Sequence, residues 1–290
     1  MTLSEIYGSE QCGLSFELYP PKTVQGEENL FKHTAELMSL QPSLITCTYG
    51  AGGSTRDKTL DIVTRVWQQF GCAVASHLTC VGSTRDDLRR YLSEAAERGI
   101  VHIVALRGDP PQGEKGFQPT AGGLAHADEL VTLIRNEFPQ FGIAVAGYPE
   151  THREAASAEV DLENLRHKVN CGADIVITQL FYDNEAFFRF RDRCESAGIG
   201  VPIVPGLLPV TKLAQIQRIT SLCGAKLPQP FVEALSAQGD SPEGQFDVGV
   251  QFASEQSQQL IDEGVPGIHY YVLNKSQATA SVLRNLRRDR

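Results

Sequence analysis

Eight short apolar segments recur along the chain of 290 residues, and each is followed by a segment whose apolar residues have helical spacing. The short segments are rich in β-branched residues, as buried parallel strands are. They are LSFEL (14–18), LITCTY (44–49), CAVASHLTC (72–80), HIVALRGD (102–109), GIAVAGYP (142–149), DIVITQLF (174–181), VPIVPGLL (201–208) and GIHYYVLN (267–274). Eight βα units with no low-complexity linker predict an α/β fold, a single (β/α)8 TIM barrel over residues 1–290, with an open doubly wound sheet as the alternative.

One stretch, from Gly224 to Val248, interrupts this alternation. Within it, LPQPFVEAL (227–235) has the spacing of a short amphipathic helix. We therefore expect an extra short helix before the last full helix and strand, inserted in the seventh βα unit.

Composition excludes several classes of function. The chain carries 26 Lys and Arg against 35 Asp and Glu, a formal net charge of −9, which argues against a nucleic-acid partner. The seven cysteines form no C-x-x-C pair and have no closely spaced His, so we expect free thiols in a reducing compartment and no metal site. With neither a secretory signal nor a run of about 18 apolar residues, the sequence predicts a cytoplasmic protein without a membrane partner.

Strand alternation assigns the side chains of each strand to two faces. In the first strand Phe16 and Leu18 share one face, while Ser15 and Glu17 share the other. In the next strands the same alternation predicts an inward face of small residues that ends in a polar one. These inward residues are Thr46 and Thr48; Ala73, Ala75 and His77; Ala105, Arg107 and Asp109; and Ala144, Ala146 and Tyr148. The pattern predicts a barrel rimmed with polar groups at the carboxyl ends of its strands, where such barrels hold their active sites.

Glu17 is the most informative of these residues. A carboxylate between Phe16 and Leu18 is costly to bury in its charged form, so the site favours the protonated form. A Glu that holds its proton near neutral pH is a natural general acid. The alternative is a buried ion pair with a neighbouring Arg or Lys.

Three further residues are candidates for ligand contacts. Asp109 ends the fourth strand segment in ALRGDPP, where it either faces the pocket or caps a turn. Gln179 closes IVITQ at the inward parity, and its amide can hydrogen-bond the edge of a heterocycle. His77 has no second metal ligand at short spacing, so a hydrogen-bonding or stacking role is expected.

A helical stripe follows the fifth strand. Asp161, Asn164 and Lys168 lie at positions i, i+3 and i+7 of the segment AEVDLENLRHKV. On spacing alone this stripe is typical of a solvated helix face.

Eight ordered motifs together resemble methylenetetrahydrofolate reductase, in its bacterial type with the catalytic barrel only. They are SFELYPP (15–21), TYGAGGSTR (48–56), SHLTC (76–80), ALRGDPP (105–111), VAGYPETH (145–152), ITQLFYD (177–183), PGLLPV (205–210) and HYYVLN (269–274). The resemblance covers residues 14 to 275. It departs from the family's usual pattern at Leu18 and Tyr19, where Phe-Phe is frequent, at Arg153, where Pro is frequent, and at Lys275, where Arg is usual.

The resemblance implies a flavoenzyme and agrees with the predicted barrel. Such an enzyme passes hydride from NADH or NADPH through FAD to 5,10-methylenetetrahydrofolate and forms 5-methyltetrahydrofolate, in the one-carbon metabolism that feeds methionine synthesis. It also implies a homo-oligomer. By position in the motifs, Glu17 is the general acid, Asp109 binds the pterin ring and tunes the flavin, Gln179 contacts folate and nicotinamide in turn, and Lys275 contacts folate.

The same resemblance implies a set of flavin contacts that includes the helical stripe. The set is Thr48, Tyr49, Ala51, His77, Arg107, Gly108, Asp109, Ala127, Tyr148, His152, Ala155, Asp161, Asn164, His167 and Lys168.

Two other functions are compatible with a barrel of this kind. One is a pterin-binding barrel that transfers a methyl group without flavin, which predicts a colourless protein. The other is a flavin-binding or folate-binding protein without turnover, which predicts bound ligand and no reaction. In such a carrier, an acid beside a flavin site has no obvious use.

Overall fold

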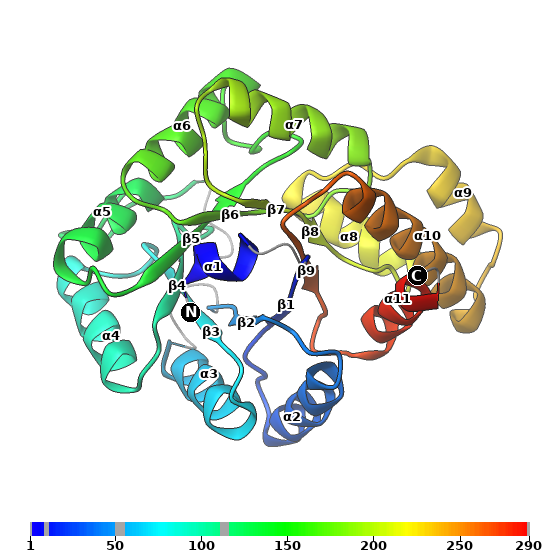
Figure 1. Cartoon of the computed structure of the whole chain (residues 1–290), viewed down its shortest axis with the longest axis horizontal. Helices are drawn as coiled ribbons and strands as arrows, with labels where there is room; N and C mark the ends of the chain where they lie inside the picture. Colours follow the sequence, from blue (N-terminus) through cyan, green and yellow to red (C-terminus); the bar gives the residue numbers. More distant parts are fainter. Residues whose placement is uncertain (1, 9–11, 50–55, 111–115, 289–290) are drawn as a thin grey trace.

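A computed structural model of the chain describes residues 2–8, 12–49, 56–110 and 116–288. Nine strands form one parallel sheet in the order β7-β6-β5-β4-β3-β2-β1-β9-β8, and helices surround it in a ring (Figure 1). The strands are β1 (Gly13–Leu18), β2 (Leu44–Cys47), β3 (Val74–Thr79), β4 (His102–Leu106), β5 (Gly142–Gly147), β6 (Ile175–Thr178), β7 (Ile203–Val204), β8 (Gly206–Leu207) and β9 (Gly267–Tyr271). The helices are α1 (Leu3–Tyr7), α2 (Val24–Met38), α3 (Arg56–Phe70), α4 (Arg85–Glu97), α5 (Ala127–Glu137), α6 (Ala158–Asn170), α7 (Asn184–Ser196), α8 (Leu213–Cys223), α9 (Gln229–Ser236), α10 (Pro242–Asp262) and α11 (Gln277–Arg288).

The predicted seventh strand is present as two short pieces. β7 pairs with β6 and β8 pairs with β9, and only Pro205 separates the two pieces. Proline has no N–H to donate, but its carbonyl accepts a hydrogen bond from the His269 N–H at 2.9 Å. The ring therefore closes through this residue, and the predicted TIM barrel is confirmed.

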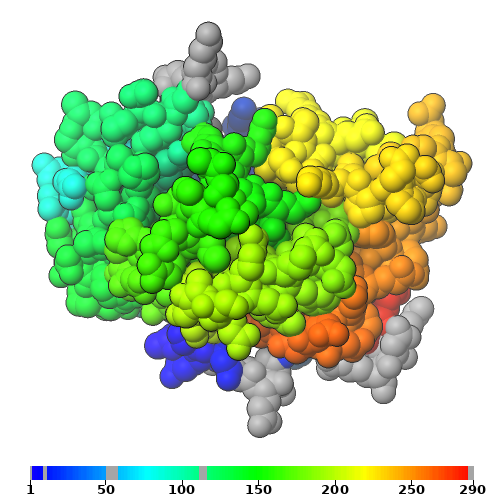
Figure 2. All heavy atoms as spheres, turned by 90° about the horizontal axis from the view of Figure 1, so that it is seen from above, coloured from blue at the N-terminus to red at the C-terminus, as the bar shows by residue number. Residues whose placement is uncertain are grey.

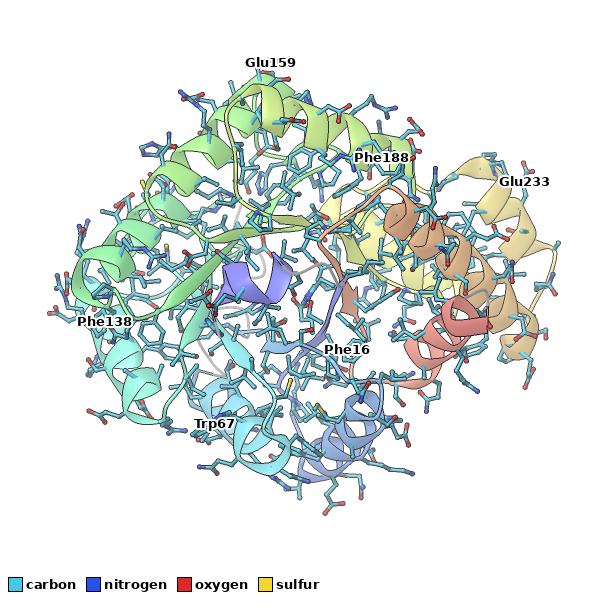
Figure 3. The ribbon with its side chains drawn as sticks, viewed as in Figure 1. Phe16, Trp67, Phe138, Glu159, Phe188 and Glu233 are labelled. Atoms are coloured by element: carbon cyan, nitrogen blue, oxygen red, sulfur yellow. The ribbon has the colours of Figure 1, made fainter. Side chains whose placement is uncertain are left out.

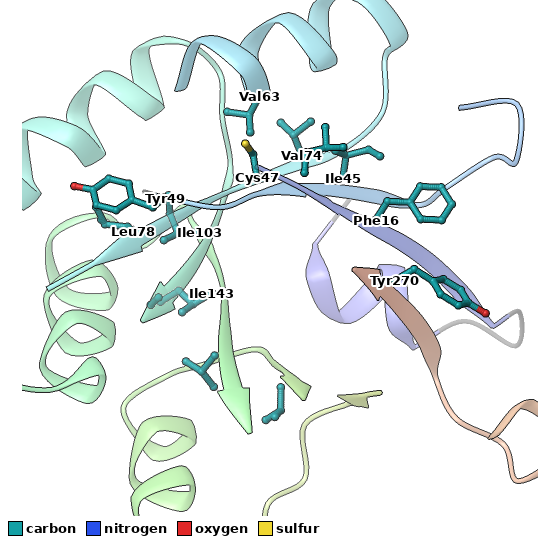
Figure 4. Close-up of a cluster of buried hydrophobic side chains, with 14 of the residues drawn as sticks. Phe16, Ile45, Cys47, Tyr49, Val63, Val74, Leu78, Ile103, Ile143 and Tyr270 are labelled. Atoms are coloured by element: carbon teal, nitrogen blue, oxygen red, sulfur yellow. The ribbon is translucent and has the colours of Figure 1, made fainter. Parts of the chain in front are cut away.

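Strands β2 to β7 pack their two faces into different cores. Phe16, Ile45, Val74 and Tyr270 belong to the outer core beneath the helices (Figure 4). A smaller inner core fills the barrel axis with side chains of the opposite parity: Leu44, Ala75, Val104, Ala144, Ile175, Ile177 and Val204. The predicted faces of the first strand are therefore confirmed, with Phe16 and Leu18 outward.

The predicted parity of the fourth strand was wrong. Val104 is in register with the inward His77 and belongs to the inner core, whereas Ala105 lies in the outer core. Both faces of β4 are buried, so the run HIVAL has no alternation of polar and apolar residues that tells the two faces apart. Gly108 has φ +88°, so the extended backbone ends before it and the strand's parity does not continue to Asp109.

A short helix that the sequence analysis did not predict closes the amino-terminal end of the barrel. α1 begins with a capping box between Thr2 and Glu5, and it buries Leu3, Ile6 and Tyr7 in the inner core. Figure 1 shows it within the ring of strands. An apolar plug at this end leaves the carboxyl ends of the strands as the open, polar end.

The predicted insertion is confirmed, with a different boundary. α9 lies between α8 and α10, and the rings of Phe231 and Phe252 stack at 3.9 Å in a third core. α10 already begins at Pro242, so Val248 lies inside that helix rather than at the end of the insertion. In Figure 2 the yellow residues of α8 and α9 form one side of the molecule, and α4 (cyan) lies on the other.

The outer helices carry the polar surface. Figure 3 shows Glu159 and Glu233 at the rim and Phe16 inside the ring. Among the described residues, no helix is both long and apolar enough to cross a membrane.

The plug provides a stability test. Leu3 is fully buried, and Leu3→Ala leaves a cavity at the closed end of the barrel, so the free energy of unfolding should fall by about 3 kcal/mol. Val24→Ala, at a side chain that is 79% exposed, should change it by less than about 0.5 kcal/mol. Urea unfolding followed by circular dichroism measures both; equal effects would show that α1 does not pack as described.

Candidate active site

Glu17 lies on the inward face of β1, between Thr46 of β2 and Tyr271 of β9 in the sheet register. Its carboxyl oxygen Oε2 is 3.4 Å from Nε2 of His77 and 3.6 Å from Nε2 of His269. Within the described part of the chain, these two imidazoles are its only ion-pair partners, and no Arg or Lys is within 4.0 Å. The alternative of an ion pair with Arg or Lys therefore has no support in the described residues.

The imidazole of His77 is held neutral. Burial lowers its pKa, the charge of Glu17 raises it, and His269 lowers it again. A neutral imidazole can donate or accept a hydrogen bond beside the carboxyl group without forming a full ion pair.

His269 was not singled out from the sequence, although it lies as close to Glu17 as His77 does. Its ring packs edge-on against Tyr271 at 5.1 Å, and its Nδ1 is 2.8 Å from Oγ of Ser15. The available sequence signal was the alternation in GIHYY, which places His269 and Tyr271 on one face.

Beyond the ends of β4 and β5, polar side chains form the rim of the barrel. The guanidinium of Arg107 donates to Glu154 at 2.6 Å and lies over the ring of Phe117 at 5.0 Å. Asp109 is exposed, and burial together with its charge raises the pKa of Tyr148. The charge of Asp109 thus acts on the Tyr148 hydroxyl group.

The loop after β5 is tied to the start of α6. The rings of Tyr148 and His152 meet edge-on at 4.6 Å, and the His152 backbone N–H donates to the Asp161 carboxylate at 2.9 Å. Burial lowers the pKa of His152, and the charge of Arg107 lowers it further. The backbone N–H of Ala155 donates to the His152 carbonyl at 2.9 Å and tightens the same loop.

The helical stripe of α6 is divided. Lys168 is half-buried and donates to the Ala146 carbonyl at 2.5 Å, near the carboxyl end of β5. Burial lowers the pKa of Lys168 to about 8, although Asp161 and Asp128 raise it. Asn164 and His167 are exposed, and His167 pairs with Asp128 at 3.2 Å. The expectation of a solvated helix face therefore holds for Asn164 but not for Lys168.

The remaining predicted flavin contacts lie at the ends of β2, β4 and the start of α5. Thr48 donates its N–H to the Leu18 carbonyl at 2.8 Å, and Tyr49 packs edge-on against Tyr91. A Cβ at Gly108 would lie 2.6 Å from a methyl group of Val81, so only glycine fits there. Ala127 is the first residue of α5. Ala51 lies outside the described residues.

The two predicted folate contacts also lie at strand ends. Gln179 follows β6, and its Oε1 accepts the Leu180 N–H at 2.9 Å, which leaves the amide NH₂ group as a donor. Lys275 is exposed beyond β9. Among the described residues there is no group of three or more side chains suited to hold a metal ion.

Comparisons with known proteins identify the family. The sequence model described as methylenetetrahydrofolate reductase matches residues 2–287. The 5,10-methylenetetrahydrofolate reductase of Escherichia coli is 39% identical over 285 residues, with 98% of this chain and 93% of that protein covered. Methylenetetrahydrofolate reductase (NADH) 1 of Arabidopsis thaliana is 38% identical over 95% of this chain, which spans about half (48%) of the plant protein.

Among solved structures, a protein from Clostridium thermocellum that binds two copies of 5-methyl-5,6,7,8-tetrahydrofolic acid has a TM-score of 0.65, at 17% identity, with 99% of this chain and 98% of that chain covered. Dihydropteroate synthase from Xanthomonas albilineans has a TM-score of 0.53 at 12% identity, over 96% of this chain and 93% of that one. These two likenesses support the barrel fold alone. The family match along almost the whole chain goes further, and the protein belongs to the methylenetetrahydrofolate reductase family.

Proposed function

We propose that the protein is an FAD-dependent oxidoreductase that reduces 5,10-methylenetetrahydrofolate to 5-methyltetrahydrofolate with NADH or NADPH, in the one-carbon metabolism that feeds methionine synthesis. The observation that carries the proposal is the Glu17 carboxyl group, which faces the barrel interior beside two imidazoles and no cation among the described residues. A carboxyl group in such surroundings is suited to donate a proton. The family match supplies the substrate.

The polar groups of the barrel fit a flavin dinucleotide. One buried polar atom near Glu17, Oγ1 of Thr46, has no hydrogen-bond partner in the described structure, as expected of an atom that awaits a ligand. Arg107 and Lys168 provide cations at the rim for the anionic pyrophosphate, and Tyr148 and His152 provide rings. When bound, FAD would accept hydride from the nicotinamide and deliver it to the folate.

The protein's own part in the reaction is to supply a proton, orientation and an electrostatic field. Glu17 donates its proton to the leaving nitrogen of the folate's five-membered ring, which opens to an electrophilic iminium. His77 and His269 then face the carboxylate that remains. Asp109 binds the pterin ring, and the Gln179 amide contacts folate and nicotinamide in turn, with Lys275 at the folate. The other polar residues at the strand ends hold the flavin.

The direct test is a visible absorption spectrum of the purified protein with FAD. Anaerobic NADH or NADPH should bleach the flavin bands, and methylenetetrahydrofolate should restore them. A colourless protein that takes up no FAD would favour the methyl-transferring barrel, and a flavin that nicotinamide does not bleach would favour a carrier.

Replacing Glu17 by Gln should separate the two half-reactions. Reduction of the flavin by nicotinamide needs no protein acid and should keep its rate, whereas reduction of methylenetetrahydrofolate should slow by at least about 10². Stopped-flow absorbance measures each half-reaction alone. Comparable losses in both would remove Glu17 from the role of acid.

Replacing Lys168 by Met should weaken FAD binding roughly tenfold at pH 7, because an ammonium group beside the pyrophosphate is lost. The pKa of Lys168 in the free protein is about 8, and bound FAD favours the charged form. Above this pH binding must take up a proton, so the FAD affinity of the unmodified protein should fall as pH rises through about 8.

Fluorescence titration with FAD measures this affinity, and the Met variant should lack the decline. Arg166→Met is the matched control, since Arg166 lies on the same helix but is exposed and pairs with Glu163. Equal effects of the two substitutions would indicate a general charge effect.

A further inference from the structure

A continuous chain of polar groups runs from the amino-terminal plug to Glu17. The Tyr7 hydroxyl of α1 donates to Oγ of Ser15 at 2.7 Å, and this Oγ lies 2.8 Å from Nδ1 of His269. Nε2 of the same imidazole is 3.6 Å from Oε2 of Glu17. Tyr7, Ser15 and His269 are each at most 2% exposed, so water does not compete for these contacts.

The contacts of Ser15 favour one direction for the next hydrogen bond. Ser15 has one hydroxyl proton, and among the described residues its oxygen has two partners, the Tyr7 hydroxyl, which donates to it, and Nδ1 of His269. Nδ1 of His269 is therefore the one described acceptor for the Ser15 proton. A neutral imidazole that accepts at Nδ1 carries its own proton on Nε2.

We propose that Tyr7 is a positioning residue for proton donation by Glu17: through Ser15 it fixes His269 as the Nε2–H tautomer, so that an N–H group faces the Glu17 carboxyl group. The effect on catalysis rests on the function proposed above, whereas the effect on the tautomer does not. The proposal makes α1 a support of the active site as well as a plug.

The tautomer affects the chemistry because Glu17 changes charge. An N–H that points at the carboxyl group stabilises the carboxylate left after the proton has gone. The other tautomer would present a lone pair to that carboxylate and repel it. Nε2 of His269 has no hydrogen-bond partner in the described structure and lies 3.6 Å from Oε2 of Glu17, so a proton on Nε2 is available to that carboxyl group.

The remaining titratable groups around Glu17 are neutral. His77 of β3 has a pKa lowered by burial, and Tyr271 of β9 has a pKa raised by burial and by the charge of Glu17. Burial and Glu17 likewise raise the pKa of the Cys47 thiol on β2. With neutral neighbours, the orientation of one N–H dipole has a larger effect on the carboxyl group than it would beside a full charge.

The tautomer is tested directly by long-range proton–nitrogen NMR on protein labelled with ¹⁵N-histidine, with the His269 signals assigned from a His269→Gln variant. The unmodified protein should give the Nε2–H pattern, and Tyr7→Phe should give a mixture or the Nδ1–H form. Tyr270→Phe is the matched control, because it removes an equally buried hydroxyl group. Tyr270 lies on the outer face of β9, and its hydroxyl group forms a hydrogen bond with Ser257. This control should leave the pattern unchanged.

Kinetics test the consequence for the reaction. Tyr7→Phe should slow the folate half-reaction about 5- to 10-fold, the range expected for one buried hydrogen bond, without slowing flavin reduction by nicotinamide. The pH at which the folate step loses half its rate should rise, since the carboxylate is less stabilised. The loss in the double variant Tyr7→Phe/Ser15→Ala should match that of Ser15→Ala alone, because both substitutions break one chain.

Specific outcomes would overturn the proposal. One is an Nδ1–H tautomer in the unmodified protein, and another is an unchanged tautomer in Tyr7→Phe. Equal effects of Tyr7→Phe and Tyr270→Phe on the folate step, with no movement of its pH profile, would reduce Tyr7 to a structural role. Failure of the proposed function is distinct: the unmodified protein would then not reduce methylenetetrahydrofolate at all, while the NMR result would be unaffected.

Discussion

The site depends on the burial of a carboxyl group inside a ring of parallel strands. Transfer of a charged carboxylate from water into such an interior is strongly unfavourable unless something compensates it. At Glu17 the described structure provides two imidazoles rather than a guanidinium or ammonium group. An Arg at this distance would place a permanent positive charge beside the carboxyl group, whereas an imidazole can present either a donor or an acceptor nitrogen to it. Ser15 of β1 and Tyr271 of β9 lie on the same inward face of the sheet as this carboxyl group.

Barrel closure gives the two ends of the ring different properties. α1 fills the amino-terminal end with Leu3 and Ile6, and the inner core continues this apolar filling along the axis. The polar side chains collect at the carboxyl ends, where strand positions fix them more firmly than loops alone would. Tyr7 is the exception, because its ring belongs to the apolar plug and its hydroxyl group bonds Ser15, on the same face of β1 as Glu17. The short helix α1 therefore closes the amino-terminal end of the barrel and also contacts the polar residues of β1.

Much of this architecture follows from the sequence, because hydrophobic periodicity reports which face of a strand is buried. The eight strand segments, the insertion at α9 and the inward position of Glu17 were predicted in this way. Periodicity could not predict α1, whose five residues are too few. It gave the wrong face for Ala105 because both faces of β4 are buried and its residues show no alternation. His269 was missed for another reason: its contact with Ser15 joins positions 254 residues apart, which no local pattern encodes.

Arg153, where the resemblance leads to the expectation of a proline, makes defined contacts in the structure. Its guanidinium donates to the carbonyls of Ser221 and Leu222 at 3.0 and 2.7 Å, which satisfies the last turn of α8, and Gly224 allows the close approach of its side chain. Glu150 of the same loop accepts the Lys226 N–H at 3.0 Å, beyond that helix end. The loop that carries His152 is therefore hydrogen-bonded both to the last turn of α8 and to the segment that follows it. A proline at position 153 could stiffen the loop but could not make these bonds. Arg153 therefore links the loop to the end of α8, next to the contacts of His152 with Tyr148 and Asp161.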